Sequence, residues 1–396
     1  MVAAMRWINV SIVGLLFCLV GATAYAQKRP SKVAVTDLVK KTVYHSPQTP
    51  GYTCWVDCWL MPDGKLRVSF TQATGPFEGR PRTRKDVQQK LSWPPEGKPE
   101  YVKYDMAGLN MDVIYLASSD GGSTWEQVSA DPAATPMNGW VNGEAAIADG
   151  TIFRNVWGQY LPFYDVPQTG YLQSSRDGGK TWGGPSPFYD EKIRKTWPKR
   201  LRILRDGRFV VVGGMLPAIT ANETRQGSEG TRSLPALWIS EDQGRHWSDP
   251  IILWSDKSII PTEEVDIAEL ADGDLLAVVR VDSTQRRWQT VLAKDGKTWK
   301  PGPVEKLWIP HSGMPELMAT REGIVLHLAT DGIAWTADKG THWAYLEDTP
   351  HTGYYPASVQ LPDGRIFCVY HIGGDNYYGQ VDQRIEAITF RLKLEK

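Results

Sequence analysis

Short apolar runs alternate with tight polar turns along most of the chain. Six segments share one pattern: an apolar strand, a turn centred on Asp-Gly (Glu-Gly in one copy) and a second apolar strand. Asp-Gly between apolar runs is a strong β-hairpin signal. The six predicted hairpins have their turns within 60–66, 147–152, 204–209, 270–275, 319–324 and 361–366.

A second motif lies between successive hairpins. It reads Ser or Thr, then Asp two residues later, a Gly, and a Trp three residues after that Gly. The Asp and Gly build a tight turn in which the carboxylate accepts local backbone hydrogen bonds, and the Trp folds back to bury its ring. The five copies occupy 118–125, 175–182, 240–247, 295–299 and 336–343, the fourth being one residue short.

The alternation of the two motifs predicts the architecture. Each hairpin supplies the first two strands of a sheet, and each Asp-containing turn joins the third and fourth. Four-stranded units repeated in this way are propeller blades. We therefore predict an all-β, six-bladed β-propeller of four-stranded antiparallel blades. The sixth blade lacks the motif, and we expect strands at 388–392 and 41–45 to complete it. Residues 71–110 read as a long loop over one face.

The N-terminus carries a different pattern. Arg6 precedes an uncharged apolar run at 8–20, and Ala24-Tyr25-Ala26 follows as a cleavage signal. This order is typical of a secretory signal peptide. We predict a signal peptide at 1–26, a linker at 27–40 and the propeller at 41–396. The mature protein is then secreted or periplasmic and has no membrane span.

Composition narrows the partners. The formal net charge is −1, which gives no indication of a nucleic-acid or membrane-surface partner. Three cysteines remain after signal removal (Cys54, Cys58 and Cys368), and their disulfide state stays open. No Cys/His cluster has zinc-site spacing. We expect no metal, no other cofactor and a monomer.

Two blades resemble the sialidase (neuraminidase) superfamily, whose propellers carry the same Asp-containing turn, the Asp box. The stretch from Glu263-Glu264 to Arg280 is similar to the segment that holds that family's general base and second substrate-binding arginine. The stretch Tyr354-Tyr355-Pro356 resembles the segment of its catalytic tyrosine. The resemblance implies that Tyr355 is the nucleophile, Glu264 its base and Arg280 a substrate ligand. A neighbouring carboxylate suits a phenol, whose reference pKa is near 10.

The resemblance also implies an aspartic acid that protonates the leaving oxygen. It would come from the region between the first hairpin and the first Asp box. Asp112 and Asp105 are the main candidates, with Asp86 a third, and the sequence does not separate them.

Three positions depart from the sialidase pattern. Cys54 stands where the first carboxylate-binding arginine is expected, and His371 stands where its partner glutamate would fall. The stretch 329–335 carries no third arginine. Each charge-assisted hydrogen bond contributes about 1.5–3 kcal/mol, so sialosides are predicted to bind weakly.

Strand polarity directs a set of polar and aromatic side chains to one face. Aromatic rings stack on sugars, and charged groups fix hydroxyls or a carboxylate. Beyond Arg280 and His371, we expect substrate contacts from Trp55, Asp57, Arg200 and His311. The other residues placed on this face are Trp140, Glu144, Trp157, Trp197, Lys199 and Glu316.

The sequence therefore predicts an exo-glycosidase that removes a terminal sugar or sugar acid from a glycan. One alternative is a propeller polysaccharide lyase, in which Tyr355 with His371 or His311 abstracts a proton from a uronate. Another is a carbohydrate-binding propeller without catalysis.

Overall fold

A computed structural model of the chain describes residues 32–48, 51–76, 78–90, 105–132, 140–157, 170–183, 193–217, 234–254, 261–347, 351–372 and 383–395, with short pieces at 30, 94, 99, 186–187 and 259. The predicted signal peptide, 1–26, lies outside the described residues.

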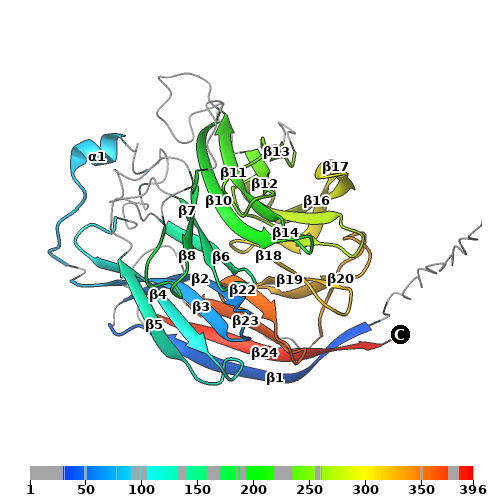
Figure 1. Cartoon of the computed structure of the whole chain (residues 1–396), viewed down its shortest axis with the longest axis horizontal. Coiled ribbons are helices and arrows are strands. Elements are labelled where there is room, and N and C mark those ends of the chain that lie inside the picture. The colour runs from blue at the N-terminus through cyan, green and yellow to red at the C-terminus, as the bar shows by residue number, and fades with distance from the viewer. Residues whose placement is uncertain are drawn as a thin grey trace, which may run out of the picture.

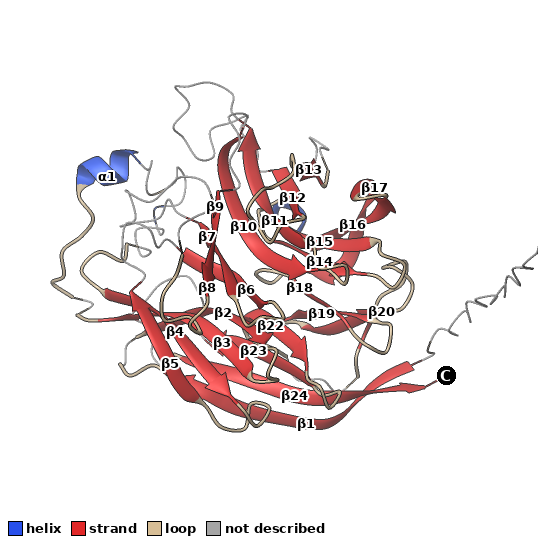
Figure 2. Cartoon of the chain, viewed as in Figure 1, coloured by secondary structure: helices blue, strands red, loops and turns tan. Residues whose placement is uncertain are grey.

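The described strands form six four-stranded antiparallel sheets, which confirms the predicted all-β propeller (Figures 1 and 2). Blades one to three consist of β2 (Tyr52–Leu60), β3 (Leu66–Thr74), β4 (Asn110–Ser118) and β5 (Glu126–Pro132); β6 (Trp140–Ala146), β7 (Ile152–Trp157), β8 (Tyr171–Ser175) and β9 (Ser186–Pro187); and β10 (Ile193–Ile203), β11 (Phe209–Pro217), β12 (Leu234–Ser240) and β13 (Ile251–Ile252).

Blades four and five follow the same order. They consist of β14 (Val265–Glu269), β15 (Leu275–Val281), β16 (Arg286–Asp295) and β17 (Thr298–Pro310); and β18 (Glu316–Ala319), β19 (Val325–Ala329), β20 (Gly332–Thr336) and β21 (Ala344–Tyr345). A short 3₁₀ helix, η2 (Asp282–Thr284), follows β15.

The sixth blade closes the ring with both ends of the chain. It contains β22 (Tyr354–Gln360), β23 (Ile366–Ile372), β24 (Arg384–Glu395) and, as its outer strand, β1 (Lys32–His45). Figure 1 shows β1 running beside β24. The strand begins nine residues before the predicted start at 41, so residues 32–40 of the predicted linker belong to the blade. The reason is cross-strand pairing: Lys32 already faces Glu395 in the antiparallel register.

Each Asp box builds the predicted turn. In the first copy, Asp120 Oδ1 accepts hydrogen bonds from the backbone N–H of Ser123 at 2.8 Å and of Thr124 at 2.9 Å. The Thr124 hydroxyl also donates to Asp120 Oδ2. This hydroxyl, the two N–H groups and the Ser118 hydroxyl stabilise the ionised carboxylate and hold its pKa below the usual value. The carboxylate of Asp177 accepts the corresponding two N–H groups in the second copy, and those of Asp242 and Asp338 each accept the N–H four residues later. These turns connect the third and fourth strands of their blades.

Apolar side chains fill the spaces between neighbouring blades. One cluster joins Val68 and Phe70 of blade one to Phe367 and Val369 of blade six. This packing across the seam holds the ring closed, since burying each such side chain contributes about 1.5–3 kcal/mol.

The long insertion in blade one contains a single short helix among its described residues, α1 (Lys85–Lys90). No helix in the described part of the chain is long and apolar enough to cross a membrane.

Candidate active site

Glu264, Arg280 and Tyr355 meet at one end of the inner strands. The Tyr355 hydroxyl donates a hydrogen bond to Glu264 Oε1 at 2.7 Å, and Arg280 Nη1 donates to Glu264 Oε2 at 2.8 Å. Arg280 Nε also donates to Asp282 Oδ1 at 2.6 Å. Both oxygens of the Glu264 carboxylate are therefore held by the two groups that the sequence placed with it.

Hairpin register explains why Glu264 and Arg280 face each other. The Arg280 N–H donates to the Glu264 carbonyl at 3.0 Å, one step beyond the last ladder pair of β14 and β15. Two residues at such an antiparallel pair carry their side chains on the same face of the sheet. The turn at 270–275 thus sets the spacing between the carboxylate and the guanidinium.

Tyr355 adopts a left-handed backbone conformation, with φ at 50°. It lies at a register shift between Tyr354 and Ala357, where β22 bulges away from β23. A left-handed non-glycine residue costs about 1–3 kcal/mol, so surrounding contacts must hold it. The bulge turns the phenol toward Glu264, as bulges near active sites commonly do.

The His371 side chain packs against this bulge. Its ring stacks with the Tyr355 ring at a centroid distance of 5.7 Å. Its Nδ1 accepts the backbone N–H of Trp55 at 2.9 Å. Trp55 has φ at 56°, and it too lies at a register shift, between β2 and β3. One imidazole therefore contacts both left-handed non-glycine residues of the described inner strands.

Cys54 and His371, the two residues that depart from the expected pattern, are in contact. Cys54 Sγ lies 3.9 Å from His371 Nε2, and both side chains are fully buried. Burial lowers the pKa of His371 to about 3, so the ring is neutral at pH 7. A thiol and a neutral imidazole thus stand at the two positions where the resemblance led us to expect an arginine and a glutamate.

The electrostatics of the site favour an ionised Glu264. Burial by itself raises the pKa of this carboxyl, but the charges of Arg280 and Lys199 and the hydrogen bond from Tyr355 outweigh that effect and hold the pKa below its usual value. Arg280 in turn stays protonated, because Glu264 and Asp282 raise its pKa against the effect of burial. The carboxylate is consequently ready to accept a proton from the phenol.

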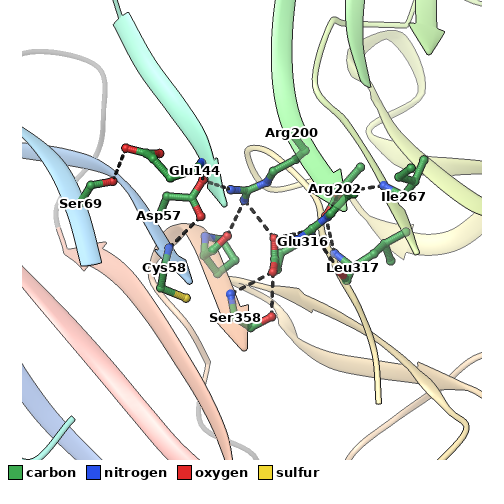
Figure 3. A network of polar contacts seen from close by, with 12 residues as sticks. Asp57, Cys58, Ser69, Glu144, Arg200, Arg202, Ile267, Glu316, Leu317 and Ser358 are labelled. Atoms are coloured by element: carbon green, nitrogen blue, oxygen red, sulfur yellow. Dashed lines mark hydrogen bonds and ion pairs between the residues drawn. The ribbon is translucent and has the colours of Figure 1, made fainter. Parts of the chain in front are cut away.

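Figure 3 shows a buried polar network around Arg200. Arg200 forms ion pairs with Asp57 Oδ2 at 3.2 Å and with Glu316 Oε2 at 3.0 Å. Its Nη2 donates to the carbonyl of Pro356 at 2.8 Å, directly after Tyr355 in the chain. Asp57 and Arg200 are 6% and 3% exposed. This geometry favours support of the Tyr355 strand over the direct substrate contact that the sequence predicted.

The candidate acids lie in different surroundings. Asp105 is fully buried, and its carboxylate accepts hydrogen bonds from Thr83 N and Oγ1 and from Ala107 N at 2.7–3.0 Å. These contacts of Asp105 stabilise the conformation of the insertion in blade one. Asp112 is half-buried, and burial together with Asp131 raises its pKa. Asp86 is engaged by the exposed Arg84.

Two of the remaining predicted contact residues, His311 and Trp55, have described side chains. His311 approaches the site, with Nε2 at 3.7 Å from Asp282 Oδ1, and burial and Arg280 lower its pKa. Trp55 is half-buried beside Tyr52. The side chains of Trp140 and Trp157 lie outside the described residues. No group of three or more His, Cys, Asp or Glu side chains in the described ranges is arranged to hold a metal ion.

Arg287 lies beside the site, although no sequence motif pointed to it. This fully buried side chain on β16 donates from Nη1 to the Gly313 carbonyl at 2.8 Å. The Tyr355 ring packs against the same glycine, since a Cβ there would lie 3.4 Å from Tyr355 Cε2. The sequence does contain one indication of it. Neighbouring side chains in a strand point to opposite faces, so one of the adjacent Arg286 and Arg287 must point inward.

The described strands form a six-bladed β-propeller, and the chain is similar to sialidases in sequence and in fold. No family model matches the chain. It is 23% identical over 231 residues to a sialidase of Bacteroides fragilis (strain YCH46), an alignment that covers 51% of this chain and 40% of that protein. The chain thus spans less than half of this curated relative.

Solved structures share the fold at low sequence identity. A protein of unknown function from Dyadobacter fermentans DSM 18053 is 17% identical, with a TM-score of 0.60 over 92% of this chain and 99% of that one. The Hadza microbial sialidase Hz136 is also 17% identical, with a TM-score of 0.57 over 90% and 68%. The Penicillium chrysogenum α-L-arabinanase complexed with arabinobiose is 12% identical, with a TM-score of 0.59 over 90% and 98%. Of these relatives, two are named sialidases and one an α-L-arabinanase.

Proposed function

We propose that this chain is a glycoside hydrolase of the sialidase-like superfamily that removes a terminal sugar from a glycan. The observation that carries the proposal is the 2.7 Å hydrogen bond from the Tyr355 hydroxyl to Glu264, with Arg280 fixing the second carboxylate oxygen. A nucleophile within hydrogen-bond reach of a base that is itself oriented by a third group is the arrangement of an activated nucleophile.

The chemistry runs in two displacements. Tyr355 Oη forms a bond to the anomeric carbon while its proton passes to Glu264 Oε1, and the bond to the leaving oxygen breaks as an acid protonates that oxygen. Water then attacks the anomeric carbon and gives one proton to the carboxylate that the acid has become. The bond to the phenol oxygen breaks as Glu264 returns its proton to Tyr355, which restores all three groups. Two inversions retain the configuration of the sugar.

We propose Asp112 rather than Asp105 as the acid. A raised pKa keeps a carboxyl protonated closer to neutral pH, as a proton donor requires. Asp112 stands opposite Gln72, which in turn stands opposite Thr53 of the inner strand. Two strand spacings place its backbone about 10 Å from the inner strand. Asp112→Asn should slow substrates with a poor leaving group far more than aryl glycosides with a good one.

The substrate class is inferred from the number of arginines that can bind a carboxylate, and the trio contains one, Arg280. Arg280 is 24% exposed at its side chain, and its Nε and Nη1 are already engaged by Asp282 and Glu264. Neutral residues occupy both positions of the first arginine and its partner. We therefore propose a neutral sugar, or a sugar acid bound by one charged contact, in preference to a sialoside.

The test is a panel of 4-methylumbelliferyl glycosides that includes α-L-arabinofuranoside, α-sialoside and common neutral sugars, assayed beside Glu264→Gln protein. Hydrolysis of at least one glycoside by the unsubstituted protein, together with its loss in the Glu264→Gln protein, supports the proposal. Release of an ultraviolet-absorbing unsaturated product from uronate polysaccharides would favour the lyase instead. Binding of glycans without turnover by the unsubstituted protein would leave only the carbohydrate-binding function.

We also propose that the protein is exported, with residues 1–26 removed. The mass of the mature protein recovered from the periplasm or medium should correspond to a chain that begins at Gln27. Recovery of the full-length chain from the cytoplasm would contradict this.

A further inference from the structure

Three exposed aromatic side chains lie near strand ends in blades four, five and six. Among the described residues, the exposed large hydrophobic side chains are two aliphatic and three aromatic. The aliphatic ones, Leu38 and Val39, lie on the outer strand β1. The aromatic ones are Trp308, Tyr345 and Tyr354, which are 48%, 37% and 40% exposed and lie near the ends of β17 and β21 and at the start of β22.

Trp308 and Tyr345 form one unit across two blades. Their rings are edge-to-face, with centroids 4.9 Å apart, and they come from the outer strands of blades four and five. Leu307 and Ile309 beside Trp308 are buried, which anchors the strand and leaves the indole at the surface. An aromatic pair held by its neighbours loses little side-chain entropy when a ligand stacks on it.

A polar group fixes the orientation of the tyrosine. The Tyr345 hydroxyl donates to Asp331 Oδ2, and Ser312 Oγ donates to Asp331 Oδ1 at 3.1 Å. Burial of the phenol and this contact with Asp331 raise the pKa of Tyr345, so its hydroxyl stays a donor. Each carboxylate oxygen of Asp331 has more than one lone pair and can accept a further hydrogen bond from a ligand hydroxyl.

The aromatic pair is connected to the nucleophile through a short chain segment. Ser312 precedes Gly313, against which the Tyr355 ring packs, and Arg287 donates to the carbonyl oxygens of both at 3.3 Å and 2.8 Å. Gly313 follows Trp308 by five positions in the chain, and five extended residues span at most about 18 Å. The pair therefore lies within the reach of two to four linked sugars from Tyr355.

We propose that Trp308, Tyr345 and Asp331 form a second carbohydrate-binding site, which holds an internal sugar of the glycan whose terminal residue reaches Tyr355. The inference deepens the proposed function, and it specifies an oligosaccharide or polysaccharide substrate instead of a small glycoside. The apolar face of the sugar stacks on the indole, and a ring hydroxyl donates to Asp331. Rings with one polar edge and one apolar face are suited to this combination of contacts.

Binding without turnover tests the site. Titration calorimetry is carried out with arabinobiose, arabinotriose, lactose and 3′-sialyllactose on Glu264→Gln protein, which blocks hydrolysis. At least one of these should bind, and Trp308→Ala in the same background should weaken that binding about three- to tenfold. Leu38→Ala, an exposed hydrophobic residue on β1, is the matched control and should leave the dissociation constant unchanged.

A kinetic ratio provides the second readout. In the otherwise unsubstituted protein, Trp308→Ala should lower kcat/KM for the oligosaccharide relative to kcat/KM for the aryl glycoside of the same sugar. Equal dissociation constants for the Trp308 and Leu38 variants, or no binding of any of the four oligosaccharides, would overturn the second site. Lack of hydrolysis with binding that depends on Trp308 would instead refute the proposed function and leave the site standing.

Discussion

The Tyr355 hydroxyl lies 2.7 Å from Glu264 Oε1, although 91 residues separate the two in the chain. The contact joins blade six to blade four across the propeller axis and depends on a bulge that gives Tyr355 a left-handed backbone. A short phenol–carboxylate hydrogen bond between rigid inner strands preorganises proton transfer at that oxygen.

Replacing the base should abolish most of the activity and preserve the fold. Glu264→Gln keeps the shape of the side chain but removes the proton acceptor, so kcat should fall about 10²- to 10⁴-fold. Steady-state kinetics on the aryl glycoside identified by the panel measures this. Glu263→Gln, which changes the adjacent and more exposed carboxylate, is the control and should change kcat by less than about threefold. Comparable losses in both variants would contradict the assignment of Glu264.

The acid limb of the pH profile should report Glu264. Because the active form is ionised and its pKa lies below 4.5, kcat/KM should stay high until the pH falls below that value. Arg280→Gln removes the main charge that lowers this pKa, so the midpoint of the limb should move to higher pH. Arg245→Gln, a substitution in a distant Asp box, should leave it in place. A limb that does not move in Arg280→Gln would mean that another group titrates.

His371 should act as a positioning residue for Tyr355 and Trp55. His371→Ala removes the acceptor of the Trp55 N–H and the ring that stacks on Tyr355, so kcat should fall about tenfold or more with a smaller change in KM. His371→Asn retains an acceptor at the position of Nδ1 and should recover part of the loss.

The split between kcat and KM distinguishes this role from simple destabilisation. A merely structural His371 would lower the amount of folded enzyme and leave the kinetics of the remaining enzyme unchanged. Active-site titration with a slow covalent substrate analogue separates the two cases.

Glu144 should make stability depend on pH. It is buried, donates nothing when ionised, and accepts one hydrogen bond from Ser69 Oγ at 2.7 Å. Burial and the neighbouring Asp57 raise its pKa above the unfolded value of about 4.5. The folded protein therefore keeps a proton that the unfolded chain releases, and stability is lost as the pH rises from about 4.5 through the folded pKa.

Glu144→Gln removes this titration. The difference in free energy of unfolding between variant and parent should move in favour of the variant as the pH rises, with a limiting slope of about 1.4 kcal/mol per pH unit. Urea denaturation at pH 5, 7 and 9 measures it. The exposed Glu126→Gln should show no such trend, and a flat difference for Glu144→Gln would show that Glu144 is ionised in the folded protein throughout.

The sequence by itself determined the repeating architecture and the identity of the central trio. An Asp box or an Asp-Gly hairpin encodes its turn within about eight residues, so local chemistry fixes the strands and, through the register, the pairing of Glu264 with Arg280. Six such hairpins in one chain then indicate a propeller, because in that arrangement each blade packs its faces against the neighbouring blades.

Only the tertiary structure decided which polar groups are buried and what they contact. His371 contacts Trp55 across a separation of 316 residues, and Arg200 is drawn between Asp57 and Glu316 of other blades. Trp308 and Tyr345 stand on outer strands, where a sequence pattern does not distinguish a ring packed between blades from one left at the surface. These relationships depend on how neighbouring blades pack around a common axis, and that packing is set by the whole ring and not by any one motif.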